Sequence, residues 1–475
     1  MQDTFEAKKL SRELLSFIRQ NPSPYHVTAG FARMLEEAGF VHLREGQHWT
    51  LKQGGSYYVT RNGSSLIAFR IPLKAPVSFQ IVAAHSDSPS LRIKTDPYLP
   101  CAGHYVCLNV EKYGGAILSS WLDRPLGVAG RVMVRTENGI ASRLVHPDRD
   151  LLLIPNLAIH MNRKVNEGYA YQVQKDMLPL FGDETARGKL EEEIARSIGV
   201  SPDELLSCDL FLYNRTPGTI WGASEEYISS PKLDDLQCAF SAVRALIESG
   251  SNDTCSASCA GQTSVSGTHI AAAAIFDNEE VGSLTAQGAD STFLEDTLKR
   301  IWLLVGSNGD ETDPEMDDHG HSRAENVLEA YSIAISKSFL LSADNAHAVH
   351  PQHTDKADPV HRPLMNHGPV LKFSANQKYT TDAFSASVFG TICSRAGVPW
   401  QVFHNHSDQP GGSTLGNLSN AHVSLHAADI GLAQLSMHSS YETAGVQDTL
   451  WMRRALEEFY RSDICIEDDH VLICP

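Results

Sequence analysis

Hydrophobic residues recur at helical intervals in several segments of the chain. Near the N-terminus, Leu10, Leu14 and Ile18 fall on one face of an amphipathic helix. Residues 21–24 separate this helix from a second predicted helix. The further segments expected to be helical are residues 189–198, 235–248 and 446–460. Ser201-Pro-Asp-Glu is also typical of a helix start, because serine caps the first turn and proline fits its first position.

Continuous apolar runs predict buried strands between these helices. The runs are residues 57–60, 65–71, the segment ending at His85, 269–276, 338–341, 370–373 and 400–403. Helices that alternate with continuously apolar strands are typical of an α/β fold, in which a mainly parallel sheet is sandwiched by helices.

The pattern changes between residues 94 and 231, where short strand-like runs at 106–110, 131–135 and 151–154 alternate with Gly and Pro turns. We therefore expect one discontinuous domain, residues 1–93 and 232–475, and an inserted β-rich domain, residues 94–231. Two segments without apolar periodicity are expected to be loops. They are the Ser/Gly-rich 249–267 and the acidic 306–322.

The amino-acid composition disfavours several classes of partner and site. The 475 residues include 39 Lys and Arg against 57 Asp and Glu, a formal net charge of −18, which disfavours nucleic acid and anionic membranes as partners. No apolar run approaches the ~20 residues of a membrane span. The nine cysteines form no CxxC pair, so a disulfide framework is not expected. The N-terminus lacks a signal-peptide layout, and a cytoplasmic protein is expected.

Acidic and imidazole residues stand directly after apolar strands. The residues that do so are His85, Asp87, Glu279, Glu280, Asp344 and His438, and Asp234 opens a helix. Ligands of α/β sheets bind at the carboxyl ends of strands, so these side chains are expected in one crevice. Imidazoles and carboxylates without thiolates suit zinc, manganese or cobalt, and a shared carboxylate permits two ions about 3.5–4 Å apart.

Each motif alone has an ordinary structural interpretation: a turn, an acidic loop, a helix cap or a packed histidine. Their combination favours a metal site. In His85-Ser-Asp87, residues two apart on a strand face the same side, so Asp87 can fix the ring of His85. In the Glu279–Glu280 pair, one carboxylate can bind metal while the other takes a proton from water.

Five motifs occur in the order seen in aspartyl aminopeptidases, and the chain resembles this family over essentially its whole length. The motifs are HSD, PKLDDL, DNEEVGS, SADNAHAVHP and AQLSMHSSYE. The resemblance implies a zinc exopeptidase-like domain with an inserted dimerisation domain, and two Zn²⁺ per subunit, with Mn²⁺ or Co²⁺ as alternatives. It implies His85 and Asp344 on one ion, Glu280 and His438 on the other, and Asp234 bridging both.

The resemblance also assigns roles outside the ligands. Glu279 is implied as general acid/base, and Asp87 as the residue that orients His85. His160, in LAIHMNR, is implied to reach a neighbouring subunit's active site and steady the reacting carbonyl. The family forms tetrahedral dodecamers built from dimers, whose sites face an interior chamber that admits short peptides.

An N-terminal Asp or Glu is the family's preferred substrate residue. The resemblance places Lys372 and Tyr379 at its side chain, with His350 as a further contributor and Gly412 in the glycine-rich loop 408–414. Many members have Cys where Gly411 stands, so this chain departs from the family pattern in that loop.

Two other functions stay open at this stage. The same metal centre could serve neutral or basic N-terminal residues, or the chain could be a non-enzymatic metal-binding shell. Glu279 argues against the shell, which needs ligands but no base.

Overall fold

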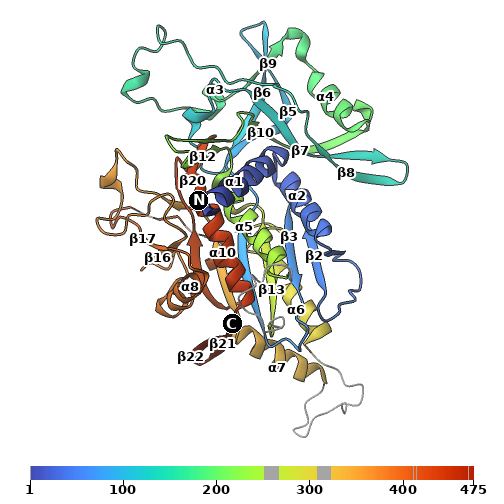
Figure 1. Ribbon diagram of the computed structural model, residues 1–475. Helices are drawn as coiled ribbons and strands as arrows, with labels where there is room; N and C mark the ends of the chain where they lie inside the picture. Colours follow the sequence, from blue (N-terminus) through green and yellow to red (C-terminus); the bar gives the residue numbers. More distant parts are fainter. Residues whose placement is uncertain are drawn as a thin grey trace.

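The structure is a computed structural model that describes residues 2–250, 267–306, 323–409, 411–412, 414–468 and 470–474. Most of the two expected loops, 249–267 and 306–322, lies outside these residues. The described chain contains a large nine-stranded sheet (Figure 1). Its strands, in spatial order, are β1 (Val41–Leu43), β2 (Ser56–Arg61), β3 (Ser65–Arg70), β13 (His269–Phe276), β4 (Ser78–His85), β14 (Phe339–Ala343), β18 (His426–Gly431), β16 (Val370–Phe373) and β17 (Gln401–His404).

The centre of this sheet is parallel and buried on both faces. Strands β13, β4, β14 and β18 run parallel to one another, and every residue of β4 and β13 is buried. Val82 and Ala84 pack into the hydrophobic core on one face, whereas Ile81 and Ala83 pack into the core on the other. Successive residues face opposite sides of the sheet and both sides are buried, so these strands are apolar at every position. This arrangement confirms the predicted α/β class.

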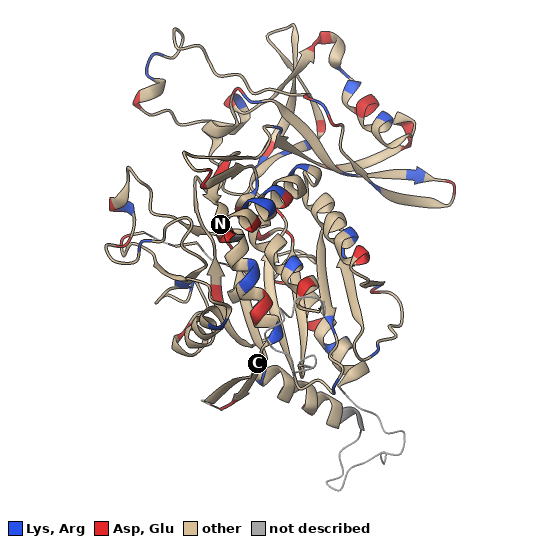
Figure 2. Ribbon diagram, viewed as in Figure 1, with Lys and Arg blue, Asp and Glu red and all other residues tan. Residues whose placement is uncertain are grey.

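Helices cover both faces of the sheet. The helices packed on the face of Val82 are α1 (Gln2–Gln20), α2 (Pro24–Glu37), α5 (Leu233–Ser249), α8 (Ala383–Ala396) and α10 (Val446–Arg461). Those on the opposite face are α6 (Phe293–Val305), α7 (Arg323–Ser336) and α9 (Leu415–His422). Helices α1 and α10 lie side by side and join the two ends of the chain, with Arg453 2.9 Å from Glu6 and Arg454 2.9 Å from Asp3 (Figures 1 and 2).

A second sheet has its own hydrophobic cluster and lies at the top of Figure 1. Its six strands in the described chain are antiparallel: β8 (Gly139–Val145), β7 (Leu126–Thr136), β10 (Leu205–Asn214), β5 (Ser90–Cys101), β6 (Tyr105–Tyr113) and β9 (Leu180–Asp183). Two helices accompany it, α3 (Val173–Asp176) and α4 (Lys189–Ile198). The helix start expected at Ser201 is wrong: its capping box opens only a 3₁₀ turn, Pro202–Glu204, which leads directly into β10.

A third sheet connects the regions around the candidate site. Its strands are β11 (Thr219–Trp221), β12 (Tyr227–Ser230), β20 (Glu442–Gly445), β19 (Ala433–Leu435) and β15 (Ala346–His347). A separate hairpin, β21 (Asp463–Glu467) and β22 (His470–Cys474), follows α10. Strand β12 precedes residue 231 but pairs with β20, so the domain boundaries at 93/94 and 231/232 stay a prediction. No helix in the described residues is both long and apolar enough to span a membrane.

Candidate metal centre

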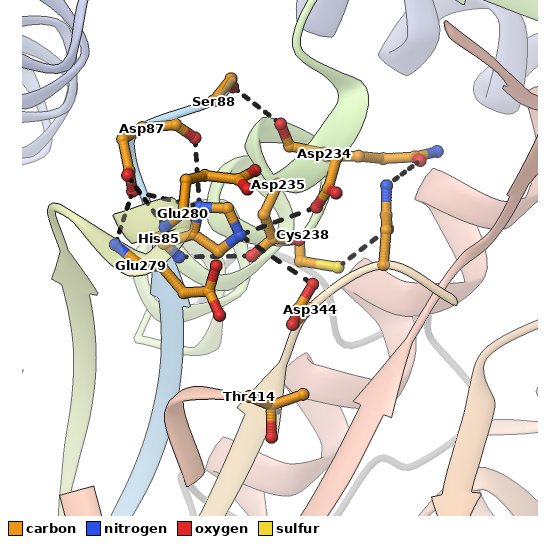
Figure 3. Close-up of polar contacts among 12 residues, drawn as sticks. His85, Asp87, Ser88, Asp234, Asp235, Cys238, Glu279, Glu280, Asp344 and Thr414 are labelled. Carbon is orange, nitrogen blue, oxygen red and sulfur yellow. Dashed lines mark hydrogen bonds and ion pairs between the residues drawn. The ribbon is translucent and has the colours of Figure 1, made fainter. Parts of the chain in front are cut away.

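Three neighbouring strands end at the same edge of the large sheet. His85 is the last residue of β4 and lies beside Phe276, the last residue of β13, while β14 runs parallel on the other side of β4. Asp344 directly follows β14, and the turn carrying Glu279 and Glu280 follows β13. The register of the parallel strands therefore brings these acidic and imidazole side chains together (Figure 3).

Asp234 lies between two histidines and faces each with a different oxygen. Its Oδ1 is 3.6 Å from Nε2 of His85, and its Oδ2 is 3.4 Å from Nε2 of His438. The same His85 nitrogen is 3.9 Å from Oδ1 of Asp344, and the His438 nitrogen is 3.4 Å from Oε2 of Glu280. The five side chains thus form two adjacent groups that share Asp234, and each group has the donor spacing of a metal site.

Backbone carbonyls orient both imidazoles. Nδ1 of His85 lies 3.1 Å from the carbonyl oxygen of Asp87, and Nδ1 of His438 lies 3.3 Å from that of Gly115. An Nδ1–H that donates to a carbonyl leaves Nε2 unprotonated and free to bind a metal. Gly115 belongs to the segment after β6, so the second sheet contributes directly to this site.

Asp87 supports the turn that carries the glutamates as well as His85. Its Oδ1 is 3.4 Å from Nδ1 of His85 and accepts the backbone N–H of Glu279 at 3.1 Å. Its Oδ2 accepts the backbone N–H of Glu280 at 3.2 Å and the hydroxyl of Tyr113 at 2.7 Å. The fully buried Asp87 carboxylate therefore fixes residues of two strand ends at once.

The site concentrates negative charge away from water. Burial raises the pKa of Glu280 and Asp344, and burial with the nearby carboxylates raises the pKa of Glu279 to about 8. Burial acts in the same direction on Asp234, but the neighbouring imidazoles of His438 and His85 lower its pKa overall. Asp234 Oδ1 and Glu280 Oε1 are buried without a hydrogen-bond partner among the described residues.

Orphaned carboxylate oxygens in a buried cluster are costly unless a cation binds them. Imidazole nitrogens and carboxylate oxygens at these distances are the donors that zinc uses. The residues present therefore fit a metal centre.

Lys372 and Tyr379 lie next to this centre but are buried. Lys372 is 3% exposed, donates to the carbonyl of Asn345 at 3.0 Å, and has its Nζ 3.8 Å from Oδ2 of Asp344. The Tyr379 ring lies 5.5 Å from this Nζ and is itself 6% exposed. In the described chain, the Lys372 charge thus lies beside a metal-site carboxylate.

The other predicted site residues lie farther out. His350 is half-buried, and its Nδ1 accepts the backbone N–H of Gln352 at 3.2 Å. Gly412 is exposed, and a Cβ there would meet no described atom within 4 Å. His160 is exposed on a surface turn of the inserted region, next to the exposed side chains of Ile159 and Met161. The described residues show no contact between His160 and the metal centre of its own chain.

Sequence reasoning missed three residues that hold the centre in place: Tyr113, Gly115 and Glu442. Glu442 accepts the backbone N–H groups of both Asp234 and His438. Its only sequence signal is an acidic residue four positions after His438, at the start of a strand. Tyr113 and Gly115 contact the centre from a segment far away in the sequence, which the spacing of residues cannot reveal.

Comparisons with known proteins match one family over most of the chain. The family model described as "Aminopeptidase I zinc metalloprotease (M18)" matches residues 17–460. A probable M18 family aminopeptidase 2 from Clostridium acetobutylicum is 41% identical over 462 residues, 95% of this chain and 98% of the relative.

Solved structures are also similar to this chain over most of its length. The cryo-EM structure of the Ape4 and Nbr1 complex superimposes with a TM-score of 0.86 at 34% identity, covering 96% of this chain and 86% of that one. The mApe1 dodecamer of S. cerevisiae superimposes with a TM-score of 0.78 at 26% identity, covering 95% of this chain and 96% of that one.

Proposed function

Because the chain belongs to the M18 family of zinc metalloproteases and is an aminopeptidase, we propose that it uses two metal ions to remove N-terminal residues from short peptides, preferably Asp or Glu. The observation that supports two ions is the placement of Asp234, whose two carboxylate oxygens face the Nε2 atoms of His85 and His438 separately.

In this proposal His85 and Asp344 hold one ion, Glu280 and His438 hold the other, and Asp234 bridges both. Zinc is the metal of the family, and the same donors suit Mn²⁺ or Co²⁺. Bound zinc lowers the pKa of water from about 15.7 toward 7 and polarises the scissile carbonyl. Asp87, Tyr113 and the carbonyl of Gly115 keep the ligands oriented.

Glu279 is the proposed general base and acid. Its carboxylate accepts the proton of the attacking water and then donates it to the leaving amine, which balances the hydrolysis. The half-buried side chain lies within ligand distance of His85 and Glu280 but is not needed to complete either group around Asp234. Burial and the neighbouring carboxylates of Asp344 and Asp87 raise the pKa of this carboxyl group above its usual value, which favours proton acceptance.

The proposed acidic preference depends on Lys372, with Tyr379, His350 and Gly412 around the substrate side chain. The 3.8 Å between Lys372 and Asp344 means that a substrate carboxylate would have to share this cation with a metal ligand. A panel of substrates that differ in the N-terminal residue tests this preference directly.

We also propose a homo-oligomer, a tetrahedral dodecamer built from dimers, and the mApe1 structure named above is a dodecamer. In it His160 would reach the active site of a neighbouring subunit and stabilise the reacting carbonyl. Its exposed position beside apolar Leu157, Ile159 and Met161, which are 55%, 48% and 70% exposed, suits a contact with another subunit. The proposed location of this assembly is the cytoplasm.

A panel of chromogenic substrates that differ in the N-terminal residue tests the function, using zinc-loaded wild-type protein and Glu279→Gln. We expect fastest turnover with Asp or Glu, loss of that preference in Lys372→Ala, and a fall in kcat of roughly 10²–10⁴-fold in Glu279→Gln with zinc retained. Equal or faster turnover of neutral or basic residues contradicts the acidic preference. Absence of peptidase activity in the loaded wild type supports a non-enzymatic shell instead.

A further inference from the structure

A buried carboxylate outside the ligand set joins the two halves of the metal centre. Glu442 begins β20 and is 2% exposed. Its Oε2 accepts the backbone N–H of Asp234 at 3.0 Å, and its Oε1 accepts the backbone N–H of His438 at 2.8 Å. We infer that Glu442 is a positioning residue that sets Asp234 and His438 at metal-binding distance before the metal arrives. The inference rests on the proposed two-metal function.

One of the two residues that Glu442 holds, His438, has a backbone conformation that requires support. Asp234 stands at the start of α5 with non-helical angles, φ −82° and ψ 113°, and His438 has a φ of +67°. A positive φ is unfavourable for a residue with a side chain and persists only where the surroundings fix it. The carboxylate of Glu442, which accepts the N–H of His438, supplies such a restraint there and holds the N–H of Asp234 with its other oxygen.

The bonds of Glu442 also set the distance between the two ligands. Asp234 Oδ2 and His438 Nε2, which would bind the same ion, lie 3.4 Å apart. The one carboxylate of Glu442 therefore holds both backbones while the two ligand atoms lie next to each other. A ligand pair that is arranged in advance loses less conformational entropy when the metal binds.

A hydrogen-bonded network connects Glu442 to the third ligand segment. Gln434 Nε2 lies 3.5 Å from Glu442 Oε1, and Gln434 Oε1 accepts from Asn345 Nδ2 at 2.8 Å. Asn345 directly follows Asp344 and also donates to the carbonyl of Leu233 at 3.1 Å. The segments that carry Asp234, Asp344 and His438 are thus connected through buried side chains that bind no metal themselves.

Asp448 offers a matched control for this role. It is fully buried on α10 and, like Glu442, its carboxylate accepts two backbone N–H groups, those of Asn366 at 2.6 Å and Gly368 at 3.0 Å. Neither of these residues is a predicted ligand. Loss of either carboxylate leaves a buried donor unpaired, but only loss of Glu442 affects ligand backbones.

The test compares zinc binding by wild type, Glu442→Gln and Asp448→Asn, measured by competition with a chelator and by the rise in Tm on adding zinc. An amide keeps the size of the carboxylate but replaces one acceptor with a donor. We expect Glu442→Gln to lose roughly 10–100-fold in affinity for one zinc ion and part of the zinc-induced Tm rise. Asp448→Asn should lower Tm with and without zinc alike and leave the affinity unchanged.

Two results overturn different claims. Wild type that binds two zinc ions, with Glu442→Gln binding them as tightly as Asp448→Asn, overturns the role of Glu442. Wild type that binds fewer than two contradicts the proposed function itself.

Hydrogen exchange on the unmodified chain decides the question if Glu442→Gln does not fold. The amides of Asp234 and His438 should exchange slowly in zinc-free as well as zinc-loaded protein, and rapid exchange without zinc would overturn the inference.

Discussion

Replacing Gly114 by Ala should weaken zinc binding from a position that touches no metal. Gly114 follows β6 with a φ of +72°, and a Cβ there would lie 3.1 Å from Cβ and 3.3 Å from the carbonyl oxygen of Glu280. Gly103 provides the matched comparison. Its φ is +70°, and a Cβ there would meet nothing within 4 Å.

The size of the effect follows from this difference. Both alanines suffer the left-handed backbone strain, about 1–2 kcal/mol each. Only the one at residue 114 crowds Glu280, by about 0.3 Å relative to ordinary contact, which begins at 3.4 Å. Zinc–oxygen bonds span only about 2.0–2.2 Å, so a displacement of this size matters at a ligand. We expect about a tenfold loss of affinity for the ion held by Glu280, equivalent to about 1.4 kcal/mol.

The assay is a chelator-competition titration of zinc, together with melting curves of the zinc-free proteins. The two variants should melt at similar, slightly lowered temperatures without zinc, and only Gly114→Ala should bind one zinc ion more weakly. Equal zinc affinity in Gly114→Ala and Gly103→Ala would refute the claim that the inserted sheet supports the position of Glu280.

Three further predictions concern the surroundings of the centre. Tyr113→Phe removes a hydroxyl that donates to Asp87, and it should lower kcat. Tyr460→Phe loses a buried hydroxyl bond to the backbone carbonyl of Ala272, far from Asp87 in the sequence, and should leave kcat unchanged. Equal kcat values in the two variants would contradict this prediction. Burial, with nearby His146 and cations, lowers the pKa of His26 to about 3, so the folded chain resists its protonation. Below about pH 6.5 the unfolded chain takes up a proton at His26 and the folded chain does not, so the free energy of unfolding falls by at most about 1.4 kcal/mol per pH unit. Between pH 7 and pH 5, Tm should therefore fall less steeply in His26→Gln than in wild type. An unchanged slope of Tm against pH refutes this. Chelation should abolish activity and lower Tm, and zinc should restore both; activity that survives complete chelation would contradict a metal mechanism.

Local pattern predicted much of the fold. Residues 269–276 and 189–198 form β13 and α4 with the predicted bounds, because one is a continuously buried strand and the other is an amphipathic helix with Gly at its end. The helix start predicted from the capping box at Ser201 is wrong, because the residues after the box form a strand that pairs with β7 and β5. Tertiary pairing there overrides a local helix signal.

Three of the candidate ligands, His85, Glu280 and Asp344, could be predicted because each stands at or after the end of a parallel strand, whereas Asp234 opens α5 and His438 follows β19 of the third sheet. His85 and Asp344 stand at strand ends, and the register of the sheet brings those ends together. The supporting contacts could not be predicted. Glu442 and Gly115 reach the centre from segments far away in the sequence, and the burial of Lys372 beside Asp344 depends on packing that no spacing reveals.

Anomalous diffraction at the zinc edge from crystals of the active protein tests the central claim most directly. The account predicts two peaks in each chain, one between His85 and Asp344 and one between Glu280 and His438, with Asp234 in contact with both. A single peak, or none in protein that still cleaves peptides, would contradict it.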